Sequence, residues 1–421
     1  MPKFLVETRD RDLKRTGVIE RYTLLDVIPR WCDVGSWSIT VPYGSSEADL
    51  LEPGRGVVIW VDGHDEPVLS GPVTRIKHEW SDTEPGGGVV TFSGSSDELA
   101  LWKRVTYPQP ALSIASQTID TYRGSGLAGP AIASLVDLNA GPGARASRRI
   151  PGLEVVPSLL GTPIQFTSRF DVLGEKVREL ATSQGLGFRV VQTSAATLAF
   201  EIYRPRDRAG SVVFSHVLGN LQDFSYVLQA PEANRFFLAA QGEGRLRYIL
   251  PYIENSLEVP GVSADPYEII DNPTPPATPW LRYWAERFVD RRDIPLAYNA
   301  SRQVINAEAG TPATDDELKA MQTAADEESV DFAEAGSLSI TPIHTPELLF
   351  GRDYFLGDRI SIEINGQYLT DVLREVRLTD SHTGGPVIRP VVGSDGATET
   401  PLLYRQVRKL WASLRKLEAR R

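Results

Sequence analysis

The stretch Gly54-Arg-Gly-Val-Val-Ile-Trp-Val-Asp-Gly63 aligns without gaps with Gly357-Asp-Arg-Ile-Ser-Ile-Glu-Ile-Asn-Gly366, about 303 residues further along the chain. Each copy starts with glycine, continues as a run rich in β-branched residues and ends in Asp-Gly or Asn-Gly, dipeptides that favour a hairpin turn. A second apolar run follows each copy, at 68–76 and 372–378. Any two β-hairpins share part of this pattern, so a chance likeness is the alternative. The more specific interpretation is two related β modules at opposite ends of the chain.

The first hundred residues predict β structure. Runs at 57–61, 68–76 and 89–92 are separated by turn signals, including Pro85-Gly86-Gly87-Gly88. Many short strands at this spacing are typical of a β-barrel or sandwich. Cys32 lies beside Trp31 in this region. We expect it to be a small buried hydrophobe rather than a reactive thiol.

Residues 106–165 are rich in Gly, Pro, Ala and Ser and predict an insertion with limited regular structure. A helix is expected next, because apolar residues recur at a spacing of three and four, and it should end near Gly185. The residues of this apolar stripe are Phe170, Leu173, Val177 and Leu180. Two strands joined by a short turn should follow, over 188–192 and 198–203.

The second half of the chain contains more β signals, and a connector at 272–279 with four prolines cannot be an interior helix or a central strand. A helix is predicted over 280–289. Thr314 and Glu317 have the spacing of a capping box, which predicts a further helix that runs to about Ala335. Its inner face would carry Leu318, Met321, Ala325 and Phe332.

The expected fold is mainly β with α+β parts: two β-barrel-like modules, an inserted helix–hairpin region and a C-terminal helix. The corresponding boundaries are 1–105 for the first module, 106–165 for the insertion, 166–210 for the helix and hairpin, 211–310 for a β region with the connector, 311–400 for the acidic helix and second module, and 401–421 for the basic C-terminal helix.

Composition excludes several classes of protein. The 421 residues are 41% hydrophobic and 24% charged, as in ordinary globular proteins, and no run approaches the roughly 20 apolar residues that span a bilayer. The net charge of −11 argues against a groove that grips nucleic acid. A single cysteine rules out an internal disulfide and a cysteine-based zinc site.

The C-terminal segment predicts an amphipathic helix with a heptad seam. Its positions are Leu403, Val407, Leu410, Leu414 and Leu417. Two heptads are too few for a coiled coil alone, so we expect self-association or docking on a partner, with packing on the same chain as the alternative. Residues 401–421 carry seven basic groups and one acidic group, which suits an acidic partner.

No catalytic, cofactor or metal-binding motif is recognisable, and we expect neither enzymatic activity nor a cofactor. The five histidines have no H-E-x-x-H spacing, and neither a G-x-S-x-G elbow nor a phosphate-binding loop occurs. An ordinary exposed hairpin turn explains the acidic sequence Asp62, His64, Asp65 and Glu66 better than a calcium site. A glycosidase pair drawn from Glu79, Asp82 and Glu84 is equally unsupported, because sequence proximity does not fix the separation of carboxylates.

One string of residues in the middle of the chain is characteristic. It comprises Phe214, Ser215, Gly219, Asn220, Asn234, Gly242 and Gly244. The order and spacing resemble the tail-tip, or baseplate hub, proteins of siphophages that infect actinobacteria, also known as minor tail proteins. The resemblance is densest over 165–250 and extends more loosely to Leu69–Val73, Phe92–Gly94 and Gly357–Leu378.

This resemblance implies a structural virion protein at the distal tail tip. Three chains with two β-barrel-like modules each would form a ring with six quasi-equivalent surfaces. Its partners would be a tail-tube or distal tail ring, downstream tip proteins and the tape measure protein, with DNA passing through without specific binding. We expect acidic groups such as Glu317, Asp326 or Glu363 to face the lumen and repel DNA. The alternatives are a tail-tip cell-wall hydrolase, a receptor-binding adhesin that uses 106–165, and the hub of a contractile machine.

Overall fold

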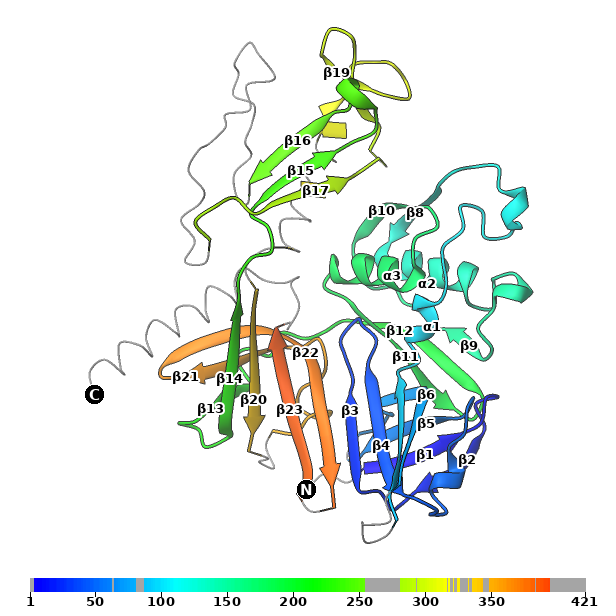
Figure 1. The fold of residues 1–421 in the computed structure, drawn as a ribbon, viewed down its shortest axis with the longest axis vertical. Helices are drawn as coiled ribbons and strands as arrows, with labels where there is room; N and C mark the ends of the chain where they lie inside the picture. The colour runs from blue at the N-terminus through cyan, green and yellow to red at the C-terminus, as the bar shows by residue number, and fades with distance from the viewer. Residues whose placement is uncertain are drawn as a thin grey trace. The chain divides into compact units, whose positions relative to one another are not determined.

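A computed structural model describes the protein as a mainly β chain (Figure 1). The described residues are 4–62, 64–80, 87–253, 281–292, 294–315, 317–318, 321, 324–325, 332, 335–343, 348–382 and 384–393. The chain divides into two compact units. Unit 1 comprises Met1–Phe224 and Ser339–Val392, and unit 2 comprises Ser225–Leu338 and Gly393–Arg421.

The first β module of unit 1 has the strand order β3-β4-β7-β6-β5-β1-β2. Alternating burial explains why these segments are strands: in β4, Trp37 and Ile39 are buried, whereas the serines on either side of Trp37 face outward. The bounds are β1 Phe4–Arg9, β2 Arg15–Ile19, β3 Leu24–Ile28, β4 Ser36–Pro42, β5 Gly56–Val61, β6 Leu69–Glu79 and β7 Val89–Ser95, with a 3-10 turn, η1, at Ala48–Leu50.

Strand β6 pairs with two different strands along its length. Its first half pairs with β5, with Ile59 opposite Leu69, and its second half pairs with β7 after a register shift between Val73 and Arg75. Such a bulge bends a strand and increases its twist, so β6 can serve both neighbours. Gly71 allows the close crossing, because a Cβ atom there would lie 2.0 Å from the Ser95 carbonyl oxygen.

The second β module repeats this arrangement. Its strand order is β13-β21-β22-β23-β20-β14, which matches β1-β5-β6-β7-β4-β3 of the first module. The modules differ in one of the described pairings, because β1 is antiparallel to β5, whereas β13 is parallel to β21. The bounds are β13 Val213–Ser215, β14 Leu221–Gln229, β20 Ala335–Pro342, β21 Arg359–Ile364, β22 Gln367–Ser381 and β23 Gly385–Gly393.

The repeat holds at the level of single residues and is therefore confirmed. Ile362 lies opposite Leu369, as Ile59 lies opposite Leu69, and the register shift recurs after Leu373, 300 residues beyond Val73. Gly54 and Gly357, the first residues of the two aligned stretches, both have a φ of 87°. Glycine is the residue that adopts this conformation without strain.

A second pair of similar sequences escaped the sequence analysis. Ser36-Trp-Ser-Ile-Thr40 of β4 corresponds to Ser337-Leu-Ser-Ile-Thr341 of β20, and Trp37, Ile39, Leu338 and Ile340 are all buried. The two modules are joined by antiparallel pairing of β3 with β22, which gives one continuous sheet. Within the described residues this sheet runs open from β14 to β2, and no strand pairing closes either module into a barrel.

An α+β part lies between the modules in sequence. Leu173, Val177 and Leu180 of α3 are buried, and Gly185 ends the helix region with a φ of 61°, as predicted. Phe170 precedes the helix instead of joining its stripe. The bounds are α1 Leu99–Trp102, η2 Ile114–Ser116, β8 Tyr122–Leu127, α2 Ala128–Asn139, η3 Ala146–Arg148, β9 Leu153–Val155, β10 Pro163–Ser168, α3 Leu173–Thr182, β11 Gly187–Ser194 and β12 Thr197–Tyr203.

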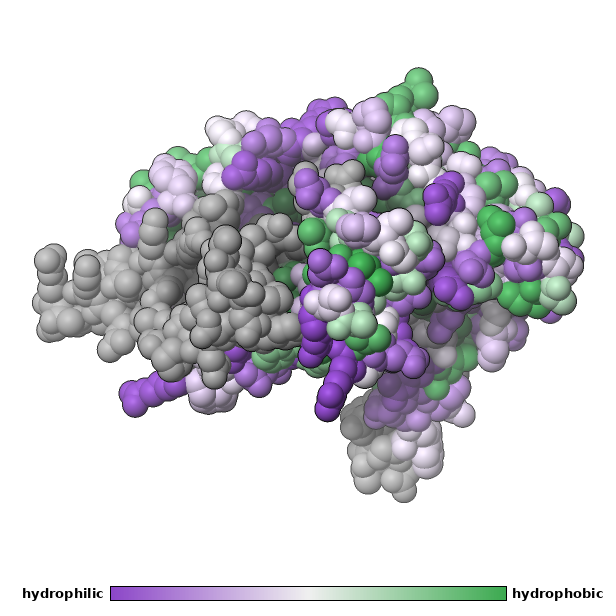
Figure 2. Space-filling view, turned by 90° about the horizontal axis from the view of Figure 1, so that it is seen from above, coloured by the Kyte–Doolittle hydropathy of each residue, from purple (hydrophilic) through white to green (hydrophobic). Residues whose placement is uncertain are grey.

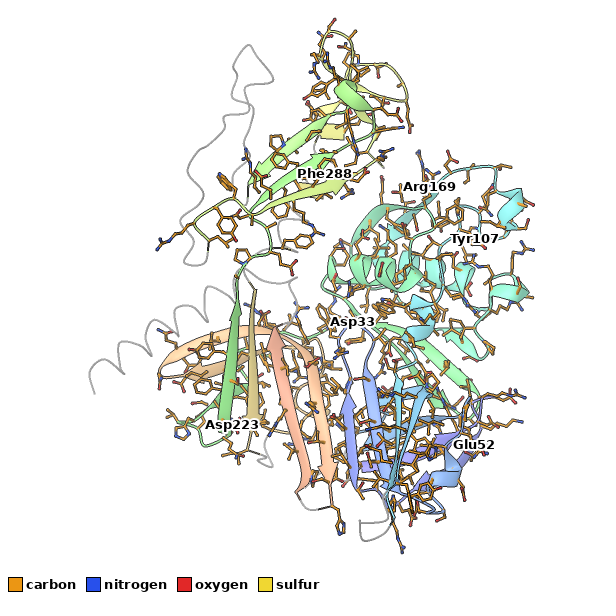
Figure 3. The ribbon with its side chains drawn as sticks, in the orientation of Figure 1. Asp33, Glu52, Tyr107, Arg169, Asp223 and Phe288 are labelled. Atoms are coloured by element: carbon orange, nitrogen blue, oxygen red, sulfur yellow. The ribbon has the colours of Figure 1, made fainter. Side chains whose placement is uncertain are left out.

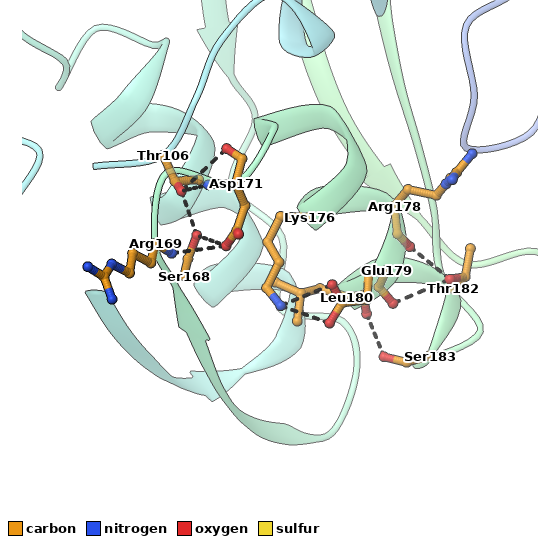
Figure 4. Close-up of polar contacts among 10 residues, drawn as sticks. All are labelled: Thr106, Ser168, Arg169, Asp171, Lys176, Arg178, Glu179, Leu180, Thr182 and Ser183. Atoms are coloured by element: carbon orange, nitrogen blue, oxygen red, sulfur yellow. Dashed lines mark hydrogen bonds and ion pairs between the residues drawn. The ribbon is translucent and has the colours of Figure 1, made fainter. Parts of the chain in front are cut away.

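Polar contacts fix the start of α3 (Figure 4). Ser168 Oγ donates to Asp171 Oδ2 over 2.7 Å, and the backbone N–H of Asp171 donates to Thr106 Oγ1 over 3.1 Å. In return, the Thr106 N–H donates to the Asp171 carbonyl oxygen over 2.9 Å. These bonds attach the chain leaving α1 to the chain entering α3.

The expectation of limited regular structure in 106–165 is wrong. This segment contains β8, α2 and β9, and begins β10. Small residues make the helix possible, because Gly129 packs so closely that a Cβ atom would lie 2.9 Å from the Leu160 carbonyl oxygen. Ile132, Leu135 and Val136 then join α3 in one apolar core.

Unit 2 contains a three-stranded sheet in which β15 lies between β16 and β17. The helix predicted over 280–289 is wrong for 286–289, because these residues form β17 and pair in parallel with β15 from Arg235 opposite Glu286. The bounds are β15 Arg235–Ala239, η4 Gly244–Leu246, β16 Ile249–Ile253, β17 Glu286–Asp290, β18 Leu296–Tyr298 and β19 Val304–Asn306. The proline-rich connector 272–279 lies outside the described residues.

The capping box is confirmed. The Thr314 N–H donates to Glu317 Oε2 over 2.8 Å, and the Glu317 N–H donates back to Thr314 Oγ1 over 3.4 Å. Met321 and Ala325 of the helix are buried, Phe332 packs on the same core, and Leu318 is exposed. The predicted end at Ala335 is wrong, because Ala335 begins β20.

We expect Gly71→Ala to destabilise unit 1. The added methyl group would have to displace backbone atoms of Ser95, and overpacking of this kind costs about 1–3 kcal/mol. Gly210→Ala is the matched control, since nothing lies within 4 Å of its Cβ position. Urea unfolding curves of the two variants and the wild type measure the difference. Equal midpoints for Gly71→Ala and Gly210→Ala would contradict the close crossing.

Candidate functional site

The first group of motif residues forms a rigid turn between β13 and β14. Asn220 closes it: its Oδ1 accepts the Ser215 N–H over 2.7 Å, and its Nδ2 donates to the Val213 carbonyl oxygen over 2.8 Å. Gly219 supplies the left-handed conformation with a φ of 70°. Phe214 is fully buried in edge-to-face contact with Tyr354, with 5.4 Å between ring centroids.

This turn is attached to the sheet and exposes two apolar side chains. The Ser215 hydroxyl donates to Glu363 of β21 and accepts the N–H of Val217 over 3.0 Å. Val217 is 84% exposed and Leu218 is 64% exposed. We call Val217 and Leu218 the apolar tip. Exposed aliphatic groups on a rigid support are suited to docking, because little conformational entropy is lost on binding.

The remaining motif residues lie in unit 2 and have a different role. The Asn234 side chain accepts the Ala285 N–H over 2.8 Å, and the Asn234 N–H donates to the Ala285 carbonyl oxygen over 2.9 Å. Gly242 and Gly244 have φ values of 104° and 54° and form the turn that leads into η4. Four of the seven residues therefore serve the turn between β13 and β14 in unit 1, and three serve the two ends of β15 in unit 2.

A cavity of about 440 Å³ lies within unit 1. Its walls come from the turn between β5 and β6, from β11 and β12, and from the segment 350–358. The chain between the paired residues Ile59 and Leu69 is three residues longer than that between Ile362 and Leu369, and it contributes His64. The ring nitrogen Nε2 of His64 donates to the Phe350 carbonyl oxygen over 2.8 Å. Gly351 makes room for this ring, since a Cβ atom there would lie 1.7 Å from it.

The acidic turn around His64 therefore holds two parts of unit 1 together. Glu66 forms an ion pair with Arg189 of β11. Burial lowers the pKa of His64, which favours its neutral form. In the part of the chain that the structure describes, no three metal-ligating side chains cluster here or elsewhere.

Glu98 is the residue of the cavity that sequence reasoning missed. Its Oε1 accepts the Val190 N–H over 2.9 Å. Burial raises the pKa of its carboxyl group to about 7, an effect that the bonds from Ser96 and Val190 reduce only in part. Burial also raises the pKa of Tyr203, which lines the same cavity. The sequence around Glu98 matches no motif, so no signal in the sequence could have found it.

The acidic residues proposed to face a lumen are placed differently. Glu363 is buried and accepts the Ser215 hydroxyl and the Gly366 N–H, so the expectation that its carboxylate faces a lumen is wrong. Glu317 belongs to the capping box, and Asp326 lies outside the described residues. Of the supposed glycosidase acids, Glu79 pairs with Lys77 at 2.7 Å, and Asp82 and Glu84 lie outside the described residues.

Cys32 is buried, as expected, and burial raises the pKa of its thiol to about 12. The heptad seam Leu403, Val407, Leu410, Leu414 and Leu417 lies outside the described residues and stays a prediction. No helix among the residues described here is long and apolar enough to cross a membrane. Hydrophilic and hydrophobic residues are interspersed on the face shown in Figure 2.

We expect Asn220→Ala to destabilise unit 1 by about 1–3 kcal/mol, because two backbone groups of the turn lose their partner. Gln222→Ala is the control, since this amide is exposed two residues away. Chemical denaturation of both variants measures the effect. If Asn220→Ala and Gln222→Ala unfold at the same denaturant concentration, the turn does not depend on its asparagine.

Glu98 makes stability depend on pH in an identifiable direction. Its pKa is raised in the folded state, so its contribution to stability is complete below about pH 4.5 and is lost as the pH rises through about 7. We therefore expect the unfolding free energy of the wild type to fall relative to that of Glu98→Gln as the pH rises over that range. Denaturation midpoints of both proteins at several pH values test this. A difference that stays constant with pH would show that Glu98 titrates normally.

Comparison with known proteins agrees with this architecture. The 43 kDa tail protein of prophage MuSo2 from Shewanella oneidensis has a similar fold, with a TM-score of 0.50 at 12% identity over 92% of this chain and 97% of that chain. A tail protein from Neisseria meningitidis MC58 gives a TM-score of 0.49 at 13% identity, over 94% and 97% of the two chains. No curated protein matches the sequence. The family of Siphovirus ReqiPepy6 Gp37-like proteins matches residues 5–394. The chain therefore belongs to the Siphovirus ReqiPepy6 Gp37-like family.

Proposed function

We propose that three copies of this chain form a ring-shaped hub at the distal end of the siphovirus tail. The ring would connect the tail tube or distal tail ring to the downstream tip proteins and form part of the conduit for DNA ejection, without catalytic activity. The observation that carries this proposal is the junction between the two β modules, together with the two strand edges that it leaves unused.

Within one chain the junction is made by β3 and β22. Leu24 lies opposite Ser381, and Val27 lies opposite Leu378. Arg377 of β22 holds Asp26 of β3 with two bonds, of 2.9 and 2.6 Å. An exposed bidentate pair of this kind fixes the register of the two strands but contributes little to stability.

The equivalent strands have no such partner among the described residues. By the repeat, β14 is the counterpart of β3, and residues 78–79 at the end of β6 are the counterpart of 378–379. The second half of β6 is exposed from Lys77 to Glu79. An exposed strand edge is a template for pairing with another chain. Pairing of β14 with β6 of the next copy would repeat the internal junction and close a ring of six modules after three chains.

The charges also repeat. Lys77 lies 300 residues before Arg377, and β14 carries an exposed acid, Asp223 (Figure 3). The pair of Lys77 with Asp223 of a second copy would correspond to the pair of Arg377 with Asp26. A ring with six similar modules would match a sixfold tail tube, while its three chains would present threefold symmetry to the tip.

Light scattering of the full-length protein over a concentration series tests the ring. We expect a mass of three times 46.4 kDa. Lys77→Glu and Asp223→Lys should each weaken the trimer, and the double variant should restore it. Lys103→Glu reverses an exposed charge outside the proposed interface and is the control. Monomers at every concentration, or a trimer that tolerates both single reversals, would contradict the proposed pairing.

A further inference from the structure

The cavity in unit 1 has features that the hub role does not use. We propose that it binds a primary ammonium group on an aliphatic stem, with the carboxylate of Glu98 as the opposite charge. The proposal does not depend on the trimer, because every residue that lines the cavity belongs to one chain.

The lining is suited to an aliphatic cation. The aromatic residues Phe188, Tyr203 and Phe350 are among those that line it, and they come from β11, β12 and the segment that holds His64. Aromatic faces attract cations through their quadrupole, and apolar walls accept a hydrocarbon stem. A volume of about 440 Å³ lies within the range of small-molecule sites, which is roughly 300–1,000 Å³.

Most of the acids around this cavity have an arginine partner, and Glu98 differs from them. Arg189 bonds Glu201 over 2.6 and 2.8 Å and also pairs with Glu66. Asp358 is held by Arg208 at 2.7 Å. Among the described residues, no ion pair reaches Glu98, whose oxygens have the Val190 N–H and the Ser96 hydroxyl as neighbours.

The remaining charged groups at the walls set the background for titration. These are Arg30, His64, Asp65, Arg204 and Arg206, and Asp97 adds a nearby negative charge. Arg30 pairs with Glu375 at 2.9 Å. Burial raises the pKa of Glu98 to about 7, so without a nearby cation this acid is largely protonated below neutral pH. A bound ammonium group favours the ionised form, so binding should release a proton there.

Two sources could supply this chemistry: a free polyamine, or a lysine side chain of a neighbouring tail protein. The probe for the shared chemistry is n-butylammonium, and n-butanol is its uncharged counterpart of similar size. Spermidine and Nα-acetyl-lysine methylamide then separate the sources. Binding of spermidine but not of the blocked lysine indicates a free polyamine, and the reverse indicates a side chain.

Isothermal titration calorimetry on the full-length protein at pH 8 tests the site. We expect n-butylammonium to bind, n-butanol not to bind, and Glu98→Gln to weaken binding of the cation at least tenfold. Glu175→Gln removes an exposed carboxylate on α3 and should leave the affinity unchanged. Equal binding of the alcohol, or equal affinity in Glu98→Gln, would overturn the proposal.

A pH series on the wild type keeps the proposal testable if Glu98→Gln fails to fold. The affinity for n-butylammonium should be constant above about pH 8 and fall about tenfold for each pH unit below 7, because protons compete for Glu98. An affinity that does not change between pH 5 and pH 8 would rule out Glu98 as the binding group.

Discussion

The antiparallel pairing of β3 with β22 is the interaction on which the arrangement of unit 1 depends. It joins strands that are about 350 residues apart in sequence, and it places Leu25 and Val27 on the same buried face as Leu378. Without it, the strands of the two β modules would form separate sheets. With it, they form one sheet in which β14 and the second half of β6 correspond to the two strands of the junction.

The long bulged strands β6 and β22 make this continuity possible. Each gives its first half to one neighbour and its second half to another, with the register shift at the same place in both modules. The shift lets one strand form a hairpin with β5 or β21 and also pair with β7 or β23. The hairpin turn is then free to vary, and in the first module its three additional residues bring His64 to the cavity.

The sequence predicted what depends on local pattern. The hairpin repeat, the helix at 173–182 and the capping box at Thr314 all follow from spacing within a dozen residues. The strand at 286–290 was missed because its identity depends on β15, about 50 residues away, and not on its own composition. The helix α2 was missed because glycine and alanine signal a loop in sequence but allow close packing in the core. The role of Glu98 could not be predicted because its environment is formed by residues about 90 positions further along the chain.

The single thiol has a practical consequence for whole-tail studies. Cys32 is enclosed by the core, and at neutral pH its sulfur stays protonated, which makes it a poor nucleophile toward maleimides and other alkylating probes. The wild-type chain should therefore react little with thiol-directed labels. A cysteine placed on any exposed strand would be the one reactive position per copy. Spin labels or fluorophores could then report distances in any assembly that the chain forms, with no native residue to remove first.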